Sequence, residues 1–280
     1  MSQSIIASCS DEVISWAATD EAKAHFESSD VNEPVNSFTV AELFKIPDGL
    51  SPAWQQFFSK VAKFHEKQCA TNPFERKLLV NRSQFMEATG RTEIEMVMHA
   101  IILKENGNLE FKKGDVAKAA LRYHFAVITF ATPDVLNNLA ACHLKLHKYD
   151  KAEDLATRAL EMDMFTNPAS IAKAYYRRAS ARLHMAKFKE AKEDAIAAIR
   201  LHTALNSSTE ELLVQIQSIH ERVSSPDEIQ SYLNEQPQCT TNIFSEPEKE
   251  NIKYVFASAC IAVPLSLQAL VRTQTSPPSY

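Results

Sequence analysis

The stretch "KYDKAED" at residues 148–154 has two counterparts elsewhere in the chain. They are "GDVAKAA" at 114–120 and "KFKEAKE" at 187–193. In each copy a polar turn leads into a helical pattern that opens on an alanine. These alanines are spaced by 33 and 39 residues: Ala119, Ala152 and Ala191. Self-similarity at a period of about 20–50 residues is the signature of a protein built from stacked structural repeats.

A second set of small residues strengthens the repeat. Gly107, Ala140 and Ala179 each lie 12 residues before one of the alanines, where a small side chain lets paired helices approach closely. The pattern therefore predicts three helical hairpins, with the extra length of the last spacing inserted in "EMDMFTNPAS" (161–170). The predicted helix pairs are 94–112 with 115–130, 133–147 with 149–163, and 168–186 with 188–202.

Composition agrees with an all-α fold. Glycine occurs only 4 times in 280 residues, which argues against Gly-rich phosphate loops, dinucleotide-binding turns and turn-dense β architectures. A seventh helix is predicted over 208–223, "STEELLVQIQSIHERV", because it opens on the Ser-x-x-Glu capping box and continues with apolar residues at helical spacing. Such a helix covers the apolar face that the last repeat would otherwise expose.

Cations and amides recur on the first helix of each predicted hairpin. Lys104 and Asn108 lie on that of repeat one, Asn138 on that of repeat two, and Lys173 and Arg177 on that of repeat three. First helices line the concave wall of a helical solenoid, so all five side chains are expected to face one groove. Their charge fits an acidic ligand, and a chain end in Asp offers two carboxylates for charge-assisted hydrogen bonds.

Three segments that contain these residues resemble a known class of repeat. They are "KENGN" (104–108), "NLAACHLKL" (138–146) and "KAYYRRA" (173–179). They are similar to the tetratricopeptide repeats (TPRs) of the carboxylate-clamp domains in chaperone cofactors: the Hop-type adaptors, the phosphatase with an N-terminal repeat domain, and the large immunophilins. Repeat two is most similar to the immunophilin group. The resemblance covers roughly residues 95–223.

The resemblance implies a co-chaperone or adaptor that binds the Glu-Glu-Val-Asp tail of heat-shock chaperones of the ninety- and seventy-kilodalton classes. Carried over, Lys104, Asn108 and Asn138 would hold the terminal carboxylate, and Lys173 and Arg177 would hold the Asp side chain and the adjacent backbone. The alternatives are a TPR scaffold that takes internal segments, and an enzyme with a site between the N-terminal extension and the repeats.

An enzyme is not expected, because no convincing acid–base pair, nucleophile elbow or P-loop occurs. Neither a cofactor nor a metal is expected: His143 and His147 are four apart but lack a third ligand nearby, so packing or surface histidines are expected there. With a net charge of −5 and no basic block, nucleic acid is not an expected partner either.

The flanks divide the rest of the chain. An aromatic helix is expected in the N-terminal extension, and it either docks on the repeats or recognises a client. No proline-isomerase domain is expected there. The predicted segments are an acidic stretch at 1–37, a helical extension at 38–92, the TPR domain with its capping helix at 93–223, a linker at 224–250 and an apolar C-terminal helix at 251–280.

Two features bear on localisation. The five cysteines are odd in number and form no CxxC, and the N-terminus lacks the basic and apolar regions of a signal peptide, so a cytoplasmic protein is expected. Residues 254–271 carry no charge over 18 residues. They are either a tail anchor in an intracellular membrane or an apolar helix folded back on the repeats, since about 20 apolar residues span a bilayer.

Overall fold

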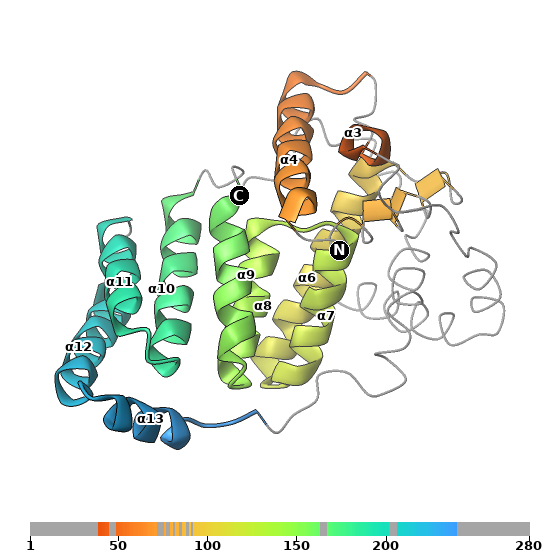
Figure 1. The fold of residues 1–280 in the computed structure, drawn as a ribbon. Coiled ribbons are helices and arrows are strands. Elements are labelled where there is room, and N and C mark those ends of the chain that lie inside the picture. The colour runs from red at the N-terminus through yellow and green to blue at the C-terminus, as the bar shows by residue number, and fades with distance from the viewer. Residues whose placement is uncertain are drawn as a thin grey trace. The chain divides into compact units, whose positions relative to one another are not determined.

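The computed structural model describes residues 39–44, 49–71, 76, 79–80, 82–83, 86–87, 90, 92–162, 167–201 and 206–239. Within these ranges the regular structure is helical and contains no strand, which confirms the predicted all-α class (Figure 1). None of these helices is long and apolar enough to cross a membrane, and the uncharged stretch 254–271 lies outside the described residues, as does the acidic segment 1–37.

The helices match the predicted hairpins. Among the described residues, α3 and α4 precede the repeats, three hairpins follow, and the capping helix and one further helix come last. The bounds are α3 Val40–Leu43, α4 Pro52–Thr71, α6 Glu93–Lys113, α7 Val116–Thr129, α8 Pro133–Lys145, α9 Tyr149–Glu161, α10 Pro168–His184, α11 Phe188–Leu201, α12 Asn206–Arg222 and α13 Pro226–Glu235.

The backbone itself repeats with the period of the sequence. Three of the described residues with a left-handed backbone each lie at the turn between the helices of one hairpin: Gly114 (φ 86°), His147 (φ 56°) and Ala186 (φ 57°). They are separated by 33 and 39 residues, as the alanines are. In the second and third hairpins the following residue donates a 2.9 Å hydrogen bond to a carbonyl of the last helical turn. The three turns are therefore one structural feature, a helix C-cap used three times.

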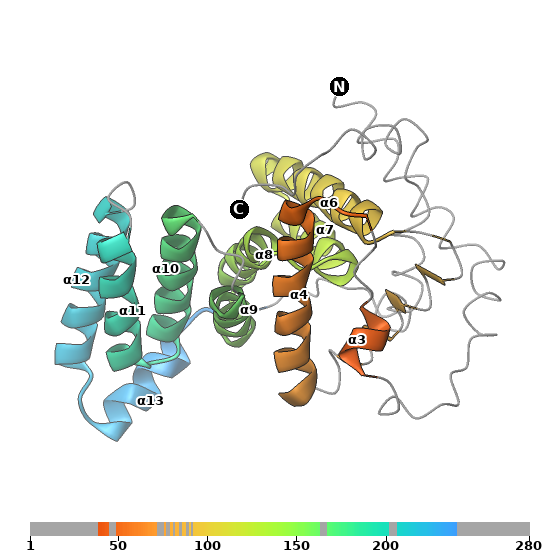
Figure 2. The ribbon, with the colours of Figure 1, turned by 90° about the horizontal axis from the view of Figure 1, so that it is seen from above.

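The chain forms two compact units, and the division falls inside α7. Among the described residues, the first unit contains α3, α4, α6 and residues 121–131. The second contains residues 114–120 and the helices from α8 to α13. Within the second unit, α8 to α12 follow one another side by side in the order of the chain, as Figures 1 and 2 show.

An aromatic cluster joins the N-terminal extension to repeat one inside the first unit. Trp54 and Phe58 on α4 are buried and stack with ring centroids 5.3 Å apart. Phe57 stacks on Phe130, just after α7, at 5.9 Å and an interplanar angle of 17°. The apolar stripe of α4 is thus used for packing, and burial of rings of this size is a major source of stability.

A buried ion pair reinforces this contact. Arg82 forms a bidentate pair with Glu93 at the start of α6 and donates from Nε to the carbonyl oxygen of Thr129 at 3.1 Å. Its guanidinium also lies over the rings of Phe44 and Phe130, 5.4 Å from each centroid. With its charge paired and its donors used, Arg82 is held at the junction of the extension and repeat one.

The second unit is closed by the capping helix. Leu212, Ile216 and Ile219 of α12 are buried in one core cluster with Ala179 and Ala191 of repeat three. The residues of α12 that enter the core recur every three or four positions, so one side of the helix covers the repeat. The predicted capping role of this helix is therefore confirmed.

A helix also forms where the sequence pattern predicted the start of a linker (224–250). α13 begins with a capping box between Ser225 and Glu228, and Pro226 occupies the first helical position. The hydroxyl of Tyr232 donates to the carbonyl oxygen of Leu183 at 3.1 Å, which attaches α13 to the end of α10. The Ser-Pro pair that reads as a linker is here a helix start.

A network of ion pairs connects repeats two and three. Asp194 on α11 accepts hydrogen bonds from Arg178 at 2.7 and 2.8 Å and from Arg182 at 2.8 Å. Arg182 and Lys187 also bind Glu153 on α9, at 2.8 and 2.5 Å. Three helices are thus linked through five charged side chains, and the buried carboxylate at the centre has its charge compensated.

Candidate functional site

All five residues of the predicted clamp lie on first helices of the hairpins. Lys104 and Asn108 are on α6 in the first unit, whereas Asn138 is on α8 and Lys173 and Arg177 are on α10 in the second. Lys173 is exposed, and the other four are half-buried. Each unit therefore carries one group of polar side chains with its own local geometry.

In the first unit, a neighbouring carboxylate contacts both predicted clamp residues. The Nζ of Lys104 lies 3.4 Å from Oε1 of Glu105, and the Nδ2 of Asn108 donates to Oε2 of Glu105 at 3.0 Å. The Oδ1 of Asn108 accepts a hydrogen bond from the hydroxyl of Tyr123 at 2.6 Å. Tyr123 thereby fixes the amide so that its NH₂ group is directed to the carboxylate.

The position of Tyr123 depends on the small residue that the repeat pattern singles out. A Cβ atom added at Gly107 would lie 2.6 Å from Cε1 and 2.7 Å from Cδ1 of Tyr123. No real side chain tolerates such distances to a packed ring, so the glycine is needed for the ring to lie against α6. Gly107 therefore acts on Asn108 through Tyr123.

Sequence reasoning missed both Glu105 and Tyr123. Tyr123 follows Ala119 by four residues on the same face of α7 and is buried. An aromatic residue at that position opposite a glycine was a signal for this contact. The signal for Glu105 was its spacing of three residues from Asn108, at which side chains on a helix are neighbours.

In the second unit, α8 and α10 are joined by a polar contact near their starts. The Nδ2 of Asn137 donates to the carbonyl oxygen of Ser170 at 3.2 Å, and the hydroxyl of Ser170 donates to Oδ1 of Asp134 at 2.9 Å. Both helices begin with a proline and a side-chain cap. They start together, so successive turns of the two helices run alongside each other.

Asn138 and Cys142 lie further along α8, and Lys173 and Arg177 lie further along α10. Burial raises the pKa of the Cys142 thiol to about 12, although the charges of Arg177 and Lys145 act in the opposite direction.

The two lysines of the predicted clamp differ in their local pairing. Lys104 pairs with Glu105, whereas Lys173 has no ion pair with any carboxylate in the part of the chain that the structure describes. An exposed ammonium group of this kind interacts with water and counterions, so its charge is accessible to a ligand. The second unit therefore offers an available cation and the first an occupied one.

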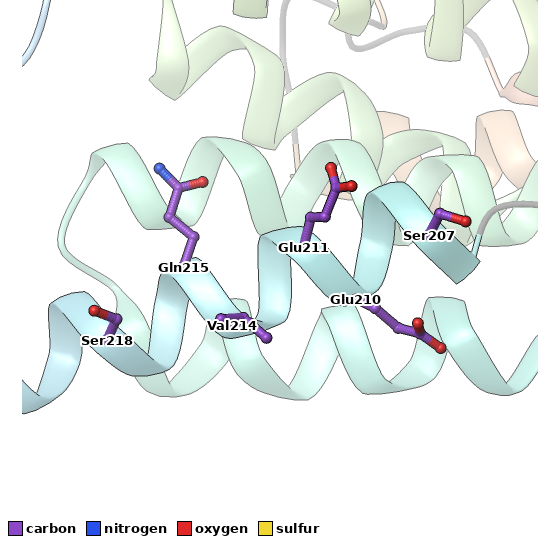
Figure 3. Close-up of a pocket in the computed structure, with 6 residues that line it drawn as sticks. All are labelled: Ser207, Glu210, Glu211, Val214, Gln215 and Ser218. Carbon is purple, nitrogen blue, oxygen red and sulfur yellow. The ribbon is translucent and has the colours of Figure 1, made fainter.

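A surface depression of about 610 Å³ lies on α12, away from these residues. Figure 3 shows its lining: Ser207, Glu210, Glu211, Val214, Gln215 and Ser218. All six side chains are exposed, and Val214 is 65% exposed. Two of the six are carboxylates and none is a cation, so this surface repels an acidic ligand and contains no residue of the predicted clamp.

Of the two histidines spaced four apart, His143 lies on α8 and His147 lies in the turn that follows it. The ring nitrogen Nδ1 of His147 lies 3.0 Å from the hydroxyl of Tyr149, and the two rings make an edge contact. Within the described ranges, no group of three or more His, Cys, Asp or Glu side chains has the geometry of a metal site.

A family model of the tetratricopeptide repeat matches residues 133–164, which contain α8 and α9. The chain is therefore a protein that contains a tetratricopeptide repeat. It is distantly related to sperm-associated antigen 1: it is 29% identical to the human protein over 137 residues (46% of this chain, 14% of that protein) and 30% identical to the mouse protein over 138 residues (46% and 15%). The chain thus matches less than a fifth of the length of these relatives. No solved structure matches it significantly.

Proposed function

We propose that this chain is a non-enzymatic co-chaperone or adaptor whose repeats bind the acidic C-terminal Glu-Glu-Val-Asp tail of a heat-shock chaperone. The observation that supports it most is the agreement of position and chemistry among five residues. Lysine, arginine and asparagine recur on the first helices of three successive hairpins: Lys104, Asn108, Asn138, Lys173 and Arg177. A TPR domain that binds protein segments is consistent with the family match over α8 and α9.

The chemistry of a free C-terminus explains why these five side chains would bind it in preference to an internal segment. A C-terminal Asp carries two carboxylates, and a charge-assisted hydrogen bond is worth about 1.5–3 kcal/mol. Asn108 and Asn138 fix orientation without adding charge. Ordering an extended tail costs part of this energy, so the affinity is expected to be modest and to fall as salt increases.

Charge reversal on α10 tests the proposal. The double variant Lys173→Glu with Arg177→Glu should lose binding to a fluorescent Glu-Glu-Val-Asp peptide, as measured by fluorescence anisotropy. The matched control reverses Lys189 and Lys192, two exposed lysines on α11. Since Arg177 is half-buried, circular dichroism checks that the double variant is folded. The single variant Lys173→Ala, at an exposed position, provides a second measurement of peptide affinity. Unchanged peptide affinity in a folded reversal variant would disprove the proposed clamp.

Amidation of the peptide tests whether the site reads a chain end. The amidated peptide keeps the Asp side chain but lacks the terminal carboxylate. The clamp should then lose binding, whereas a scaffold for internal segments should retain it. Equal affinity for the two peptides would assign the repeats to the scaffold function instead.

We place this activity in the cytoplasm, because an odd set of scattered cysteines without CxxC fits a reducing compartment. The uncharged stretch 254–271 is proposed as a tail anchor or as a helix that covers the repeats. Fractionation of cells that express the chain without residues 254–280 separates these two roles, since only an anchored protein moves from membrane to cytosol after the deletion.

A further inference from the structure

We propose that Glu105 is a specificity-determining residue of the clamp, an internal competitor that a ligand carboxylate has to displace. This inference rests on the proposed function and concerns the same site. It assigns to the first unit the selection of free carboxyl termini.

The contacts of Glu105 carry the inference. Its two carboxylate oxygens are shared between the two predicted clamp residues of α6: Oε1 lies 3.4 Å from Nζ of Lys104, and Oε2 accepts from Nδ2 of Asn108 at 3.0 Å. These are the donors that a terminal carboxylate would use. Glu105 therefore occupies the place of the ligand with the same functional group.

The surroundings of Glu105 allow a ligand carboxylate to compete with it directly for Lys104 and Asn108. Tyr123 holds Oδ1 of Asn108 at 2.6 Å, so the amide cannot turn to offer a donor elsewhere without losing that bond. The Glu105 side chain is 49% exposed and that of Lys104 only 21%. Glu105 can thus rotate into water when it is displaced, and its charge is solvated at little cost.

A consequence for ligand choice follows from this exchange. When a peptide carboxylate replaces Glu105, one charge-assisted pair is lost and an equivalent pair is formed, so the net gain at Lys104 and Asn108 is smaller than free donors would give. A peptide without a terminal carboxylate leaves Glu105 in place and gains nothing at these two residues, and so a free carboxyl terminus is selected over an amidated one.

The experiment compares Glu105→Gln with a matched control on the same helix. The control is Glu110→Gln, which removes the same charge but whose carboxylate pairs with Lys113 at 2.7 Å. Both are made in the full chain, and the probe is the fluorescent Glu-Glu-Val-Asp peptide. Glu105→Gln should lower its Kd about 3- to 10-fold, as expected for removal of a competing charged hydrogen-bond partner. Glu110→Gln should leave the Kd within about twofold, and the amidated peptide should gain nothing from Glu105→Gln.

The outcomes separate this inference from the proposed function. If the wild-type chain binds the peptide and Glu105→Gln brings no gain, Glu105 is not a competitor although the clamp stands. If both glutamine variants gain equally, the effect is long-range repulsion and the inference is wrong. If the amidated peptide gains as much as the free acid, Glu105 does not compete with the terminal carboxylate. If no variant binds the peptide at all, the proposed function fails and the inference fails with it.

Discussion

Replacing Asp194 by asparagine should weaken the contact between α10 and α11, the two helices of repeat three, more than any exposed substitution. Asp194 is 4% exposed and accepts three hydrogen bonds of 2.7–2.8 Å from Arg178 and Arg182. Burial opposes ionisation of Arg178, but its hydrogen bonds to Asp194 outweigh this and raise its pKa. The neutral asparagine would leave two guanidinium groups, 16% and 19% exposed, without this carboxylate.

The size of the effect follows from these contacts. Removing one partner of a buried ion pair typically costs about 3–5 kcal/mol. Here Arg182 retains Glu153 at 2.8 Å, and both guanidiniums keep some contact with water. We therefore expect the free energy of unfolding to fall by about 3 kcal/mol, the lower end of that range.

Urea unfolding followed by circular dichroism measures this change. The slope of the free energy of unfolding against urea concentration should stay the same, because the amount of surface exposed on unfolding does not change. The matched control is Asp154→Asn, at an exposed position on α9, which should stay within about 0.5 kcal/mol of the wild type. A loss of less than about 1 kcal/mol for Asp194→Asn would mean that these ion pairs do not hold α10 and α11 together.

Three further outcomes are expected. Ala186→Gly should raise the free energy of unfolding by about 0.5–1 kcal/mol in thermal or urea unfolding, because alanine is strained at φ 57°; Ala197→Gly, inside α11, should lower it. Burial raises the pKa of Glu153, but hydrogen bonds from a lysine and an arginine outweigh burial and bring it below its ordinary 4.5. Its contribution to stability is thus complete above pH 4.5 and is lost as the pH falls through the lower, folded-state value. The difference in thermal midpoint between wild type and Glu153→Gln should shrink accordingly on acidification, and a constant difference would contradict this role. Tyr123→Phe should weaken peptide binding about fivefold in fluorescence anisotropy, the value of one hydrogen bond, because the Asn108 amide is released; an unchanged Kd would show that its orientation does not matter.

The hairpins were predictable because a local signal repeats. Ala119, Ala152 and Ala191 are completely buried, as their shared register requires. The helix predicted over 133–147 ends at Lys145, because the backbone turns left-handed at His147, where sequence patterns favour glycine. The periodic spacing of apolar residues predicts that a helix is present. Where the helix ends depends on a left-handed C-cap, and a residue other than glycine at that position gives no sign of the cap in the sequence.

The remainder depends on contacts between residues far apart in the chain. The ion pair of Arg82 with Glu93 and the bond from Tyr232 to Leu183 have no sequence spacing that announces them. For the candidate site, the pattern identified which residue types lie on the first helices. It did not reveal that Glu105 occupies two of their donors, because that contact requires a particular side-chain conformation.

The burial of Cys142 makes alkylation of its thiol a probe of local opening in the second unit. Alkylating reagents attack thiolates, and a thiol whose pKa is about 12 on a side chain with no exposed surface presents neither the ion nor the access. The rate at which iodoacetamide labels Cys142 therefore reports how often the packing around this part of α8 opens. A ligand that stabilises this packing would slow the labelling, and so the reaction rate would show whether the ligand is bound.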